Sequence, residues 1–302
     1  MDQRQRRIWL IGQLLREYPE YQDADEVDLP IPHDDDEQRQ LLRALQNVRP
    51  PAPVSERFLH VQDEYLGGML AQRAITDADD IPPAETLRSG ATLALWQGDI
   101  TTLRCDAIVN AANSGLTGCY APNHHCIDNA IHTAAGVQLR LACERIMEQQ
   151  GHPEPVGSAK ITPGFNLPAR YVLHTVGPMI PSGDPTPAEQ EQLADCYRSC
   201  LRLAADHSLE TVAFCAISTG EFRFPAELAA RIVIRTVRDF LAQQLTHHEP
   251  EQPPKQPQTQ TSAASTESAA NHRPSNTIRK VIFDVFSDHD RQIYERVFAD
   301  HD

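Results

Sequence analysis

The stretch WQGDITTLRCDAIVNAAN, residues 96–113, decides the fold, because it predicts two short strands joined by a turn. Asp99 comes just beyond the first strand, and Asn110 and Asn113 come at the end of the second. Ligands bind at strand ends in open α/β sheets. We therefore expect these polar side chains to face a ligand, although an Asx turn at Asp99 and a cap or loop role for Asn113 would account for the same residues.

The chain beyond this stretch alternates between strands and helices. Short runs rich in β-branched residues predict six strands, at TLALWQGDI, DAIVNAAN, GSAKITPG, ARYVLHTVG, TVAFCAIS and TIRKVIFDVF. Helices are predicted at 127–150, about 188–206 and 225–245, and DHDRQIYERVFAD forms the last one. This alternation predicts an α/β fold in which a mixed or largely parallel sheet lies between helix layers.

Residues 1–85 have a different pattern and are predicted to form a helical region. Apolar residues recur at helical spacing from Ile8 to Leu15, and DEQRQLLRALQNV predicts a second helix. A third helix is predicted after Ser55, which is placed as its cap. The α/β domain then occupies residues 86–302, with an insertion at 246–277 that is rich in Pro, Gln, Ser and Thr and is predicted to be disordered.

Composition excludes several classes of function. The 302 residues carry a formal net charge of −15 with no run of Lys or Arg, so we expect no nucleic-acid partner. No segment is apolar enough to span a membrane, and the first residues lack the apolar core of a signal peptide. Seven cysteines, an odd number without a disulfide-rich domain, favour a reducing compartment. We therefore expect a cytoplasmic protein with no membrane partner.

Four soft metal ligands gather in GLTGCYAPNHHCIDNAIHTAAG, residues 115–136. Thiolates and imidazoles are the ligands that zinc prefers, and three of them from one short loop would leave a coordination position open, as in catalytic zinc sites. His124 and Cys126 are two residues apart, so one loop can direct both inward while His125 points away. The predicted ligands are therefore Cys119, His124 and Cys126. Ordinary loop cysteines and surface histidines are the alternative.

Two further segments have the composition of ligand-binding loops. Asp128 falls at the start of a predicted helix, where it is either a simple cap or a group held over the reacting part of an anionic ligand. The segment AISTGEFRFP, residues 216–225, follows another buried strand. Ser218, Thr219 and Gly220 could offer backbone amides to phosphate oxygens there, although a plain strand-to-helix turn would have the same composition.

The segments GDIT, AIVNAANSGLTG, CIDNAIHTAAG and ISTGEFRFP together resemble the macrodomain family in order and spacing, over roughly residues 88–302. Most macrodomains carry a glycine-rich loop before a helix that begins with a VDGAIH-like motif, whereas this chain has GCYAPNHHCIDNAIH. That replacement and the helical N-terminal region resemble the zinc-dependent macrodomains often encoded with class M sirtuins, which are protein-ADP-ribose hydrolases.

The resemblance implies a three-layer α/β/α macrodomain sandwich with a mixed central sheet and an N-terminal helical extension, which holds ADP-ribose across the strand ends. Asp99 would bind the adenine amine, and Ile100 would line the adenine pocket. Asn113 and Asp128 would face the distal ribose and act in catalysis. The diphosphate would bind the backbone of Ser218, Thr219, Gly220 and Glu221, with Phe222 beside the distal ribose. Cys119, His124 and Cys126 would hold one Zn²⁺ per chain.

The function implied by the resemblance is hydrolysis of mono-ADP-ribose from modified protein side chains. By resemblance alone it also implies a functional link to a class M sirtuin and to a lipoyl-carrier protein. One alternative is a non-catalytic ADP-ribose reader with a structural zinc. Another is a structural-zinc protein whose helices recruit a partner, which would need a fourth protein ligand. Cys105 and Cys143 are candidates for that ligand, but Cys143 lies about four turns down the predicted helix from Cys126.

Overall fold

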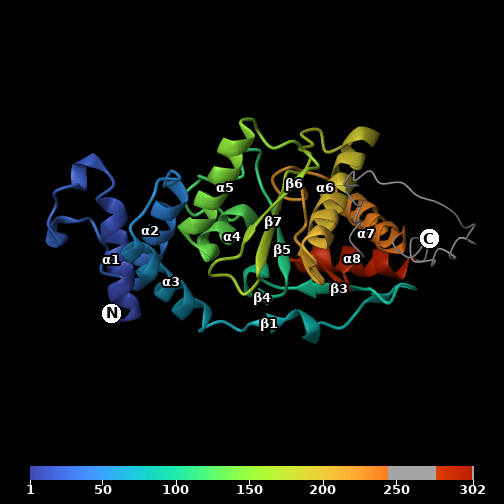
Figure 1. The fold of residues 1–302 in the computed structure, drawn as a ribbon, viewed down its shortest axis with the longest axis horizontal. Coiled ribbons are helices and arrows are strands. Elements are labelled where there is room, and N and C mark those ends of the chain that lie inside the picture. Colours follow the sequence, from blue (N-terminus) through green and yellow to red (C-terminus); the bar gives the residue numbers. More distant parts are fainter. Residues whose placement is uncertain (244–276, 301–302) are drawn as a thin grey trace, which may run out of the picture.

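The computed structural model describes residues 1–243 and 277–300, so the predicted insertion lies outside the described residues up to residue 276. The described residues form a central sheet with helices on both sides and a group of N-terminal helices at one end (Figure 1). The six predicted strands are all present as β3 and β5 to β9. Among the described helices, none combines the length and apolar composition that a membrane crossing requires.

The N-terminal region consists of α1 (Gln3–Leu15), α2 (Asp35–Val48) and α3 (Glu56–Leu70). Each begins at a side-chain cap, and the predicted cap of the third helix is confirmed, since Ser55 Oγ accepts a hydrogen bond from the Phe58 amide at 3.1 Å. The three helices enclose a small apolar core, which Val137 joins from the rest of the chain. Its fully buried members include Leu10, Ile11 and Leu14.

The central sheet has seven strands in the order β2-β3-β9-β8-β5-β7-β6. The five inner strands, β3, β9, β8, β5 and β7, run parallel to one another. The two outer strands, β2 and β6, are antiparallel to their neighbours. The strands are β2 (Glu85–Thr86), β3 (Thr92–Gln97), β5 (Ala107–Ala111), β6 (Ala159–Pro163), β7 (Tyr171–Thr175), β8 (Thr211–Phe214) and β9 (Lys280–Val285). A separate two-stranded sheet pairs β1 (Thr76–Asp77) with β4 (Leu103–Arg104).

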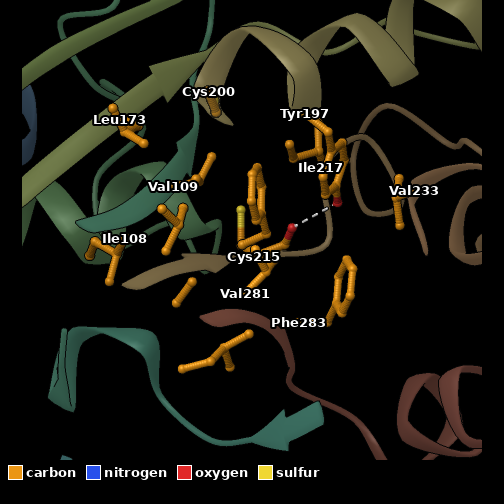
Figure 2. Close-up of a cluster of buried hydrophobic side chains, with 14 of the residues drawn as sticks. Ile108, Val109, Leu173, Tyr197, Cys200, Cys215, Ile217, Val233, Val281 and Phe283 are labelled. Atoms are coloured by element: carbon orange, nitrogen blue, oxygen red, sulfur yellow. Dashed lines mark hydrogen bonds between the residues drawn. The ribbon is translucent and has the colours of Figure 1, made fainter. Parts of the chain in front are cut away.

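Helices cover the sheet from two sides (Figure 1). Helices α4 (Ile127–Ala135) and α5 (Val137–Gln150) lie toward the N-terminal helices, whereas α6 (Pro187–Asp206), α7 (Ala226–Gln243) and α8 (Asp288–Ala299) pack in series on the other side. Figure 2 shows the core beneath α6, with Tyr197, Cys215 and Phe283 among its labelled side chains. The Tyr197 ring stacks on Phe214 with centroids 4.4 Å apart. The Tyr197 hydroxyl donates to the Cys215 carbonyl at 3.4 Å, so this buried polar group has a partner.

The single helix predicted over 127–150 is wrong, because the chain breaks at Gly136 into α4 and α5. Gly136 has φ 92° and ψ 175°, a conformation that residues with a side chain rarely adopt. A Cβ atom there would lie 2.5 Å from Gln62 Nε2 of α3, whose Oε1 accepts from the Val137 amide at 3.0 Å. A side chain of the N-terminal region therefore fixes where α4 ends.

We expect Phe283→Ala to lower the free energy of unfolding by about 3–5 kcal/mol, because it removes a fully buried aromatic ring. Phe283 is 1% exposed and packs against the rings of Tyr294 and Phe298, with centroids 5.5 and 6.0 Å away. Urea unfolding followed by circular dichroism measures the effect. The matched control is Phe286→Ala, since that ring is 84% exposed and its loss should change stability little. Equal losses in the two variants would contradict this description of the core.

Candidate functional site

The predicted site residues lie on three loops at one edge of the sheet. The loops follow β3, β5 and β8, which run parallel within the sheet, so their carboxyl ends lie at the same edge. Asp99 lies on the first loop, Cys119 on the second and Ser218 on the third. Helix α4 starts directly after the second loop, so its amino end, with Asp128, faces the same region.

Asp128 is a buried carboxylate held by two asparagines. It is 4% exposed, and its Oδ1 accepts from Asn110 Nδ2 at 2.7 Å while its Oδ2 accepts from Asn113 Nδ2 at 3.4 Å. Burial raises the pKa of Asp128 to about 6, against the opposing effects of the Asn110 hydrogen bond and the nearby Arg140 guanidinium. The cap interpretation is wrong, because the helix is capped by Cys126, whose Sγ accepts from the Asn129 amide at 3.4 Å.

Asn110 is itself oriented by His174. Asn110 is fully buried, so it contacts Asp128 inside the fold and does not face an open ligand site as expected. Its amide nitrogen also lies 3.2 Å from His174 Nδ1. An amide nitrogen can only donate, so Nδ1 accepts and the ring proton sits on Nε2, which donates to Thr162 Oγ1 at 2.9 Å. Burial holds the pKa of His174 at about 3, so the ring is neutral.

His132 lies one helical turn after Asp128, with its Nε2 3.5 Å from Asp128 Oδ1. Burial and the nearby His174 hold the pKa of His132 well below its ordinary value. The ligand atoms of His132, Cys143 and His174 lie within 4.8 Å of one another. Both ring nitrogens of His174 are already engaged by Asn110 and Thr162, which fits a hydrogen-bonded core better than a metal site. Cys143 therefore belongs to this core, on the far side of the helix break.

The structure brings Cys119, His124 and Cys126 together. Their ligand atoms all lie within 4.8 Å of one another, and Cys119 Sγ is 3.6 Å from His124 Nδ1. His125 is exposed. The other ring nitrogen of His124, Nε2, lies 3.7 Å from Glu221 Oε1 on the third loop. The two thiols and the imidazole thus converge from one loop, and the Glu221 carboxylate lies next to the second ring nitrogen of the histidine.

Asp99 forms the Asx turn that the sequence left open. Its Oδ1 accepts from the Thr101 amide at 2.9 Å, and its Oδ2 pairs with Arg73. Burial acts to raise the pKa of Asp99, but hydrogen bonds from Thr101 and Arg73 outweigh it and hold that pKa below the ordinary value. A cavity of about 280 Å³ adjoins this carboxylate, between α2, α3 and α4. The Ile100 side chain is 1% exposed and packs in the main core, so its expected place in the adenine pocket stays a prediction.

The third loop presents unengaged backbone amides. Within the described ranges, the amides of residues 218–222 donate no hydrogen bond to protein atoms. The loop is fixed by its other groups, since the Ser218 carbonyl accepts from the Phe224 amide at 2.9 Å and the Phe222 carbonyl from the Ile180 amide at 2.7 Å. Ser218 has φ 65°, which turns the chain sharply at this point. Successive free amides in such a turn can bind an anion.

Two residues near these loops were not expected from the sequence. Phe286 follows β9 and is 84% exposed, beside the Asp99 turn, because the Gly98 amide donates to the Val285 carbonyl at 3.2 Å. The sequence signal for Phe286 was its place as a large apolar residue directly before the polar segment SDHD. His174 interrupts the apolar strand segment YVLHT, and a lone histidine there gives no indication of its partner 64 residues away.

Comparison with known proteins found similar sequences and similar structures. The sequence profile described as Macro domain matches residues 109–233. A protein-ADP-ribose hydrolase from Treponema medium is 48% identical over 99% of this chain and 100% of its own length. One from Staphylococcus aureus (strain MSSA476) is 47% identical over 86% of this chain and 84% of its own. A Trypanosoma brucei macrodomain in complex with ADP-ribose superposes with a TM-score of 0.58 at 26% identity, over 84% of this chain and 94% of that one.

We expect the stability contributed by His174 to be lost in acid. Its pKa of about 3 in the folded chain lies below its ordinary 6.5, so the unfolded chain takes up a proton first as the pH falls. The contribution is complete above about pH 6.5 and is lost progressively toward pH 3. His174→Gln should therefore lower the urea unfolding midpoint at about pH 7.5, and the difference from the parent should shrink at about pH 5, since glutamine does not titrate.

The control for this measurement is His289→Gln, because His289 is an exposed histidine. That variant should unfold like the parent at both pH values. A His174→Gln difference that stays constant with pH would contradict the assignment of a neutral, buried ring.

Proposed function

The chain belongs to the macrodomain family, and from this premise we propose that it is a zinc-dependent protein-ADP-ribose hydrolase that removes mono-ADP-ribose from modified protein side chains. The observation that carries the proposal is the position of the Asp128 carboxylate, which Asn110 and Asn113 hold at the amino end of α4 beside Cys119, His124 and Cys126. Relatives that are 47–48% identical bear the name protein-ADP-ribose hydrolase, which supports the reaction class.

ADP-ribose would lie across the three loops. The Asp99 carboxylate would accept from the adenine amine, and the exposed ring of Phe286 would stack on the base. The free amides of residues 218–222 would bind the diphosphate, as backbone amides do in many phosphate sites. Phe222 would then lie beside the distal ribose, with Asn113 and Asp128 facing its hydroxyl groups and C1″. An ADP-ribose complex of the Trypanosoma brucei macrodomain supports a nucleotide site on this fold.

The loop residues fit one zinc ion per chain. Two thiols and an imidazole are a common zinc donor set, and their ligand atoms already lie within 4.8 Å of one another. Histidine ligands of zinc usually donate their second ring N–H to a carboxylate, a backbone carbonyl or water, and Glu221 Oε1 lies 3.7 Å from His124 Nε2. When bound, zinc would act as a Lewis acid toward an oxygen of the substrate or water.

The reaction would break the bond between C1″ of the distal ribose and a side-chain oxygen of the modified protein. C1″ gains positive charge as this bond lengthens, and the oxygen of a water adds to the same carbon. The side-chain oxygen leaves with the bonding electron pair and the water gives up one proton, so the products are ADP-ribose and the unmodified side chain. Asp128 would accept a hydrogen bond from that water or from a ribose hydroxyl, and its burial keeps competing solvent away. Asn113 would fix the ribose, and the amides at 218–222 would supply binding energy remote from the bond that breaks.

A non-catalytic reader would not need an open zinc site, and a structural-zinc protein whose helices recruit a partner predicts a closed one. Such a site needs a fourth protein ligand. In the described part of the chain, Cys143 contacts His174, and Cys105 donates to the Ala107 carbonyl at 3.3 Å. Among the residues that the structure describes, the group of possible metal ligands at the second loop has three members. An open position favours the hydrolase. The cytoplasmic location and the link to a class M sirtuin and a lipoyl-carrier protein stay predictions.

Metal removal tests the zinc requirement. We expect the purified chain to contain about one zinc and to release ADP-ribose from a mono-ADP-ribosylated protein, and we expect a chelator to abolish the release. Cys126→Ala should remove both metal and turnover, because it deletes a ligand. His125→Ala is the matched control and should retain both, since that side chain is exposed. Normal turnover by metal-free protein would refute zinc dependence.

Asp128→Asn separates the hydrolase from the reader. We expect the variant to lower kcat by about 100-fold or more, because it replaces the carboxylate by an uncharged group of the same shape. Its affinity for ADP-ribose, measured by calorimetry, should change only a few-fold. A loss of affinity with unchanged kcat would make Asp128 a binding group. Tight binding of ADP-ribose by the parent without any release from modified protein would instead support the reader.

A further inference from the structure

We propose that Arg43 and Asn47 of helix α2 are positioning residues for the metal ligands, so that the N-terminal helical region forms part of the metal site. The inference rests on the proposed zinc site and adds residues that lie outside the ligand set. The contacts of the N-terminal helices are distributed unequally between these helices and the rest of the chain. The three N-terminal helices pack mainly on one another, yet two polar side chains of α2 extend to the loop that carries Cys119, His124 and Cys126.

Arg43 contacts the backbone of one proposed ligand. Its Nη2 donates to the His124 carbonyl at 2.9 Å and to Asn129 Oδ1 at 2.8 Å, and its Nε donates to the same Oδ1 at 3.1 Å. One planar guanidinium therefore joins the histidine to the first turn of α4. Because the fork of an arginine is rigid, it fixes the direction as well as the distance between these two segments.

Asn129 relays this contact to a second ligand. It is 1% exposed, and each of its polar groups has a partner. Its Oδ1 accepts from Arg43, its Nδ2 donates to the Ala121 carbonyl at 3.1 Å, and its backbone amide donates to Cys126 Sγ at 3.4 Å. Arg43 thus fixes the residue that holds both the middle of the loop and the Cys126 sulfur.

Asn47, one turn further along α2, holds the residue before His124. Its Oδ1 accepts from the Asn123 amide at 3.0 Å, and its Nδ2 donates to Thr133 Oγ1 at 3.2 Å. Asn123 has φ 55°, in the left-handed region, which asparagine adopts more readily than most residues with a side chain. The bond from Asn47 stabilises this conformation, which turns the chain so that His124 faces the two cysteines.

The start of the loop is tied to the same helix. The buried guanidinium of Arg140 donates to the Thr117 carbonyl at 2.6 Å and to the Asn47 carbonyl at 2.9 Å. The ring of Tyr120 lies against this guanidinium, 4.4 Å from its centre. The loop between Thr117 and Cys126 has no helix or strand of its own, so these contacts replace the backbone ladder that would otherwise fix it.

A loop ordered in advance binds metal more tightly, because the binding step does not include the entropy loss of ordering the ligands. Partners that orient metal ligands typically account for 10-fold to 100-fold in metal affinity. The apolar core between α1, α2 and α3 is separate from these polar contacts. Loss of Arg43 should therefore weaken metal binding without unfolding the helical region.

The experiment measures zinc affinity of the full-length chain by competition with a chromophoric chelator, without any substrate. We expect Arg43→Gln to weaken zinc binding by about 10-fold to 100-fold, since a neutral amide cannot reproduce the forked contact. Its thermal midpoint and its calorimetric affinity for ADP-ribose should stay near those of the parent. Arg43→Lys should give an intermediate loss, because a single ammonium can reach only one of the two acceptors.

The matched control is Arg39→Gln, one turn earlier on α2, where the guanidinium pairs with Asp36 on the surface. It should bind zinc like the parent. Equal zinc affinity of Arg43→Gln and parent overturns the inference, while a parent chain that binds no zinc overturns the proposed metal site itself. If Arg43→Gln does not fold, Arg43→Lys takes its place, and parental zinc affinity in that variant has the same negative meaning.

Discussion

The burial of one negative charge organises this part of the molecule. The Asp128 carboxylate is 4% exposed, and burying such a group is unfavourable unless hydrogen bonds compensate. Asn110 on β5 donates to it, His174 on β7 orients Asn110, and Thr162 on β6 accepts from the Nε2–H of His174. Three neighbouring strands must therefore pair in this order for the charge to be tolerated, which joins the sheet topology directly to the candidate site.

Much of the fold follows from local patterns, and those parts were predictable. The six strands have runs of β-branched residues, and Ser55 is followed by a run with helical spacing. The strands and this helix can therefore be predicted without knowledge of tertiary contacts. The break at Gly136 was missed, because apolar residues continue across it and the Gln62 side chain that bonds the first amide after it belongs to another region. Local signals do not report such long-range packing.

The candidate site also has parts that follow from local patterns and parts that depend on distant partners. Cys119, His124 and Cys126 share one short loop, so their convergence could be anticipated from spacing. The alternative that Asp128 is a simple cap is excluded, because Cys126 takes the cap position and the carboxylate turns toward the sheet. His174 and Arg43 gave no local signal, since each acts on residues more than 60 positions away. Polar residues at isolated positions acquire a role only when the fold supplies the partner.

The contacts between α2 and the loop bear on how this architecture can be inherited or exchanged. Arg43 and Asn47 are separated from Asn129 and Asn123 by 86 and 76 positions, yet each pair is complementary in donor and acceptor. A change at one member leaves the other without a partner, so the two segments should vary together among descendants. For the same reason, we expect the loop of the α/β portion to be less well ordered without the N-terminal helices. Transplanting that portion alone would carry the proposed metal ligands but leave behind the groups that contact their loop.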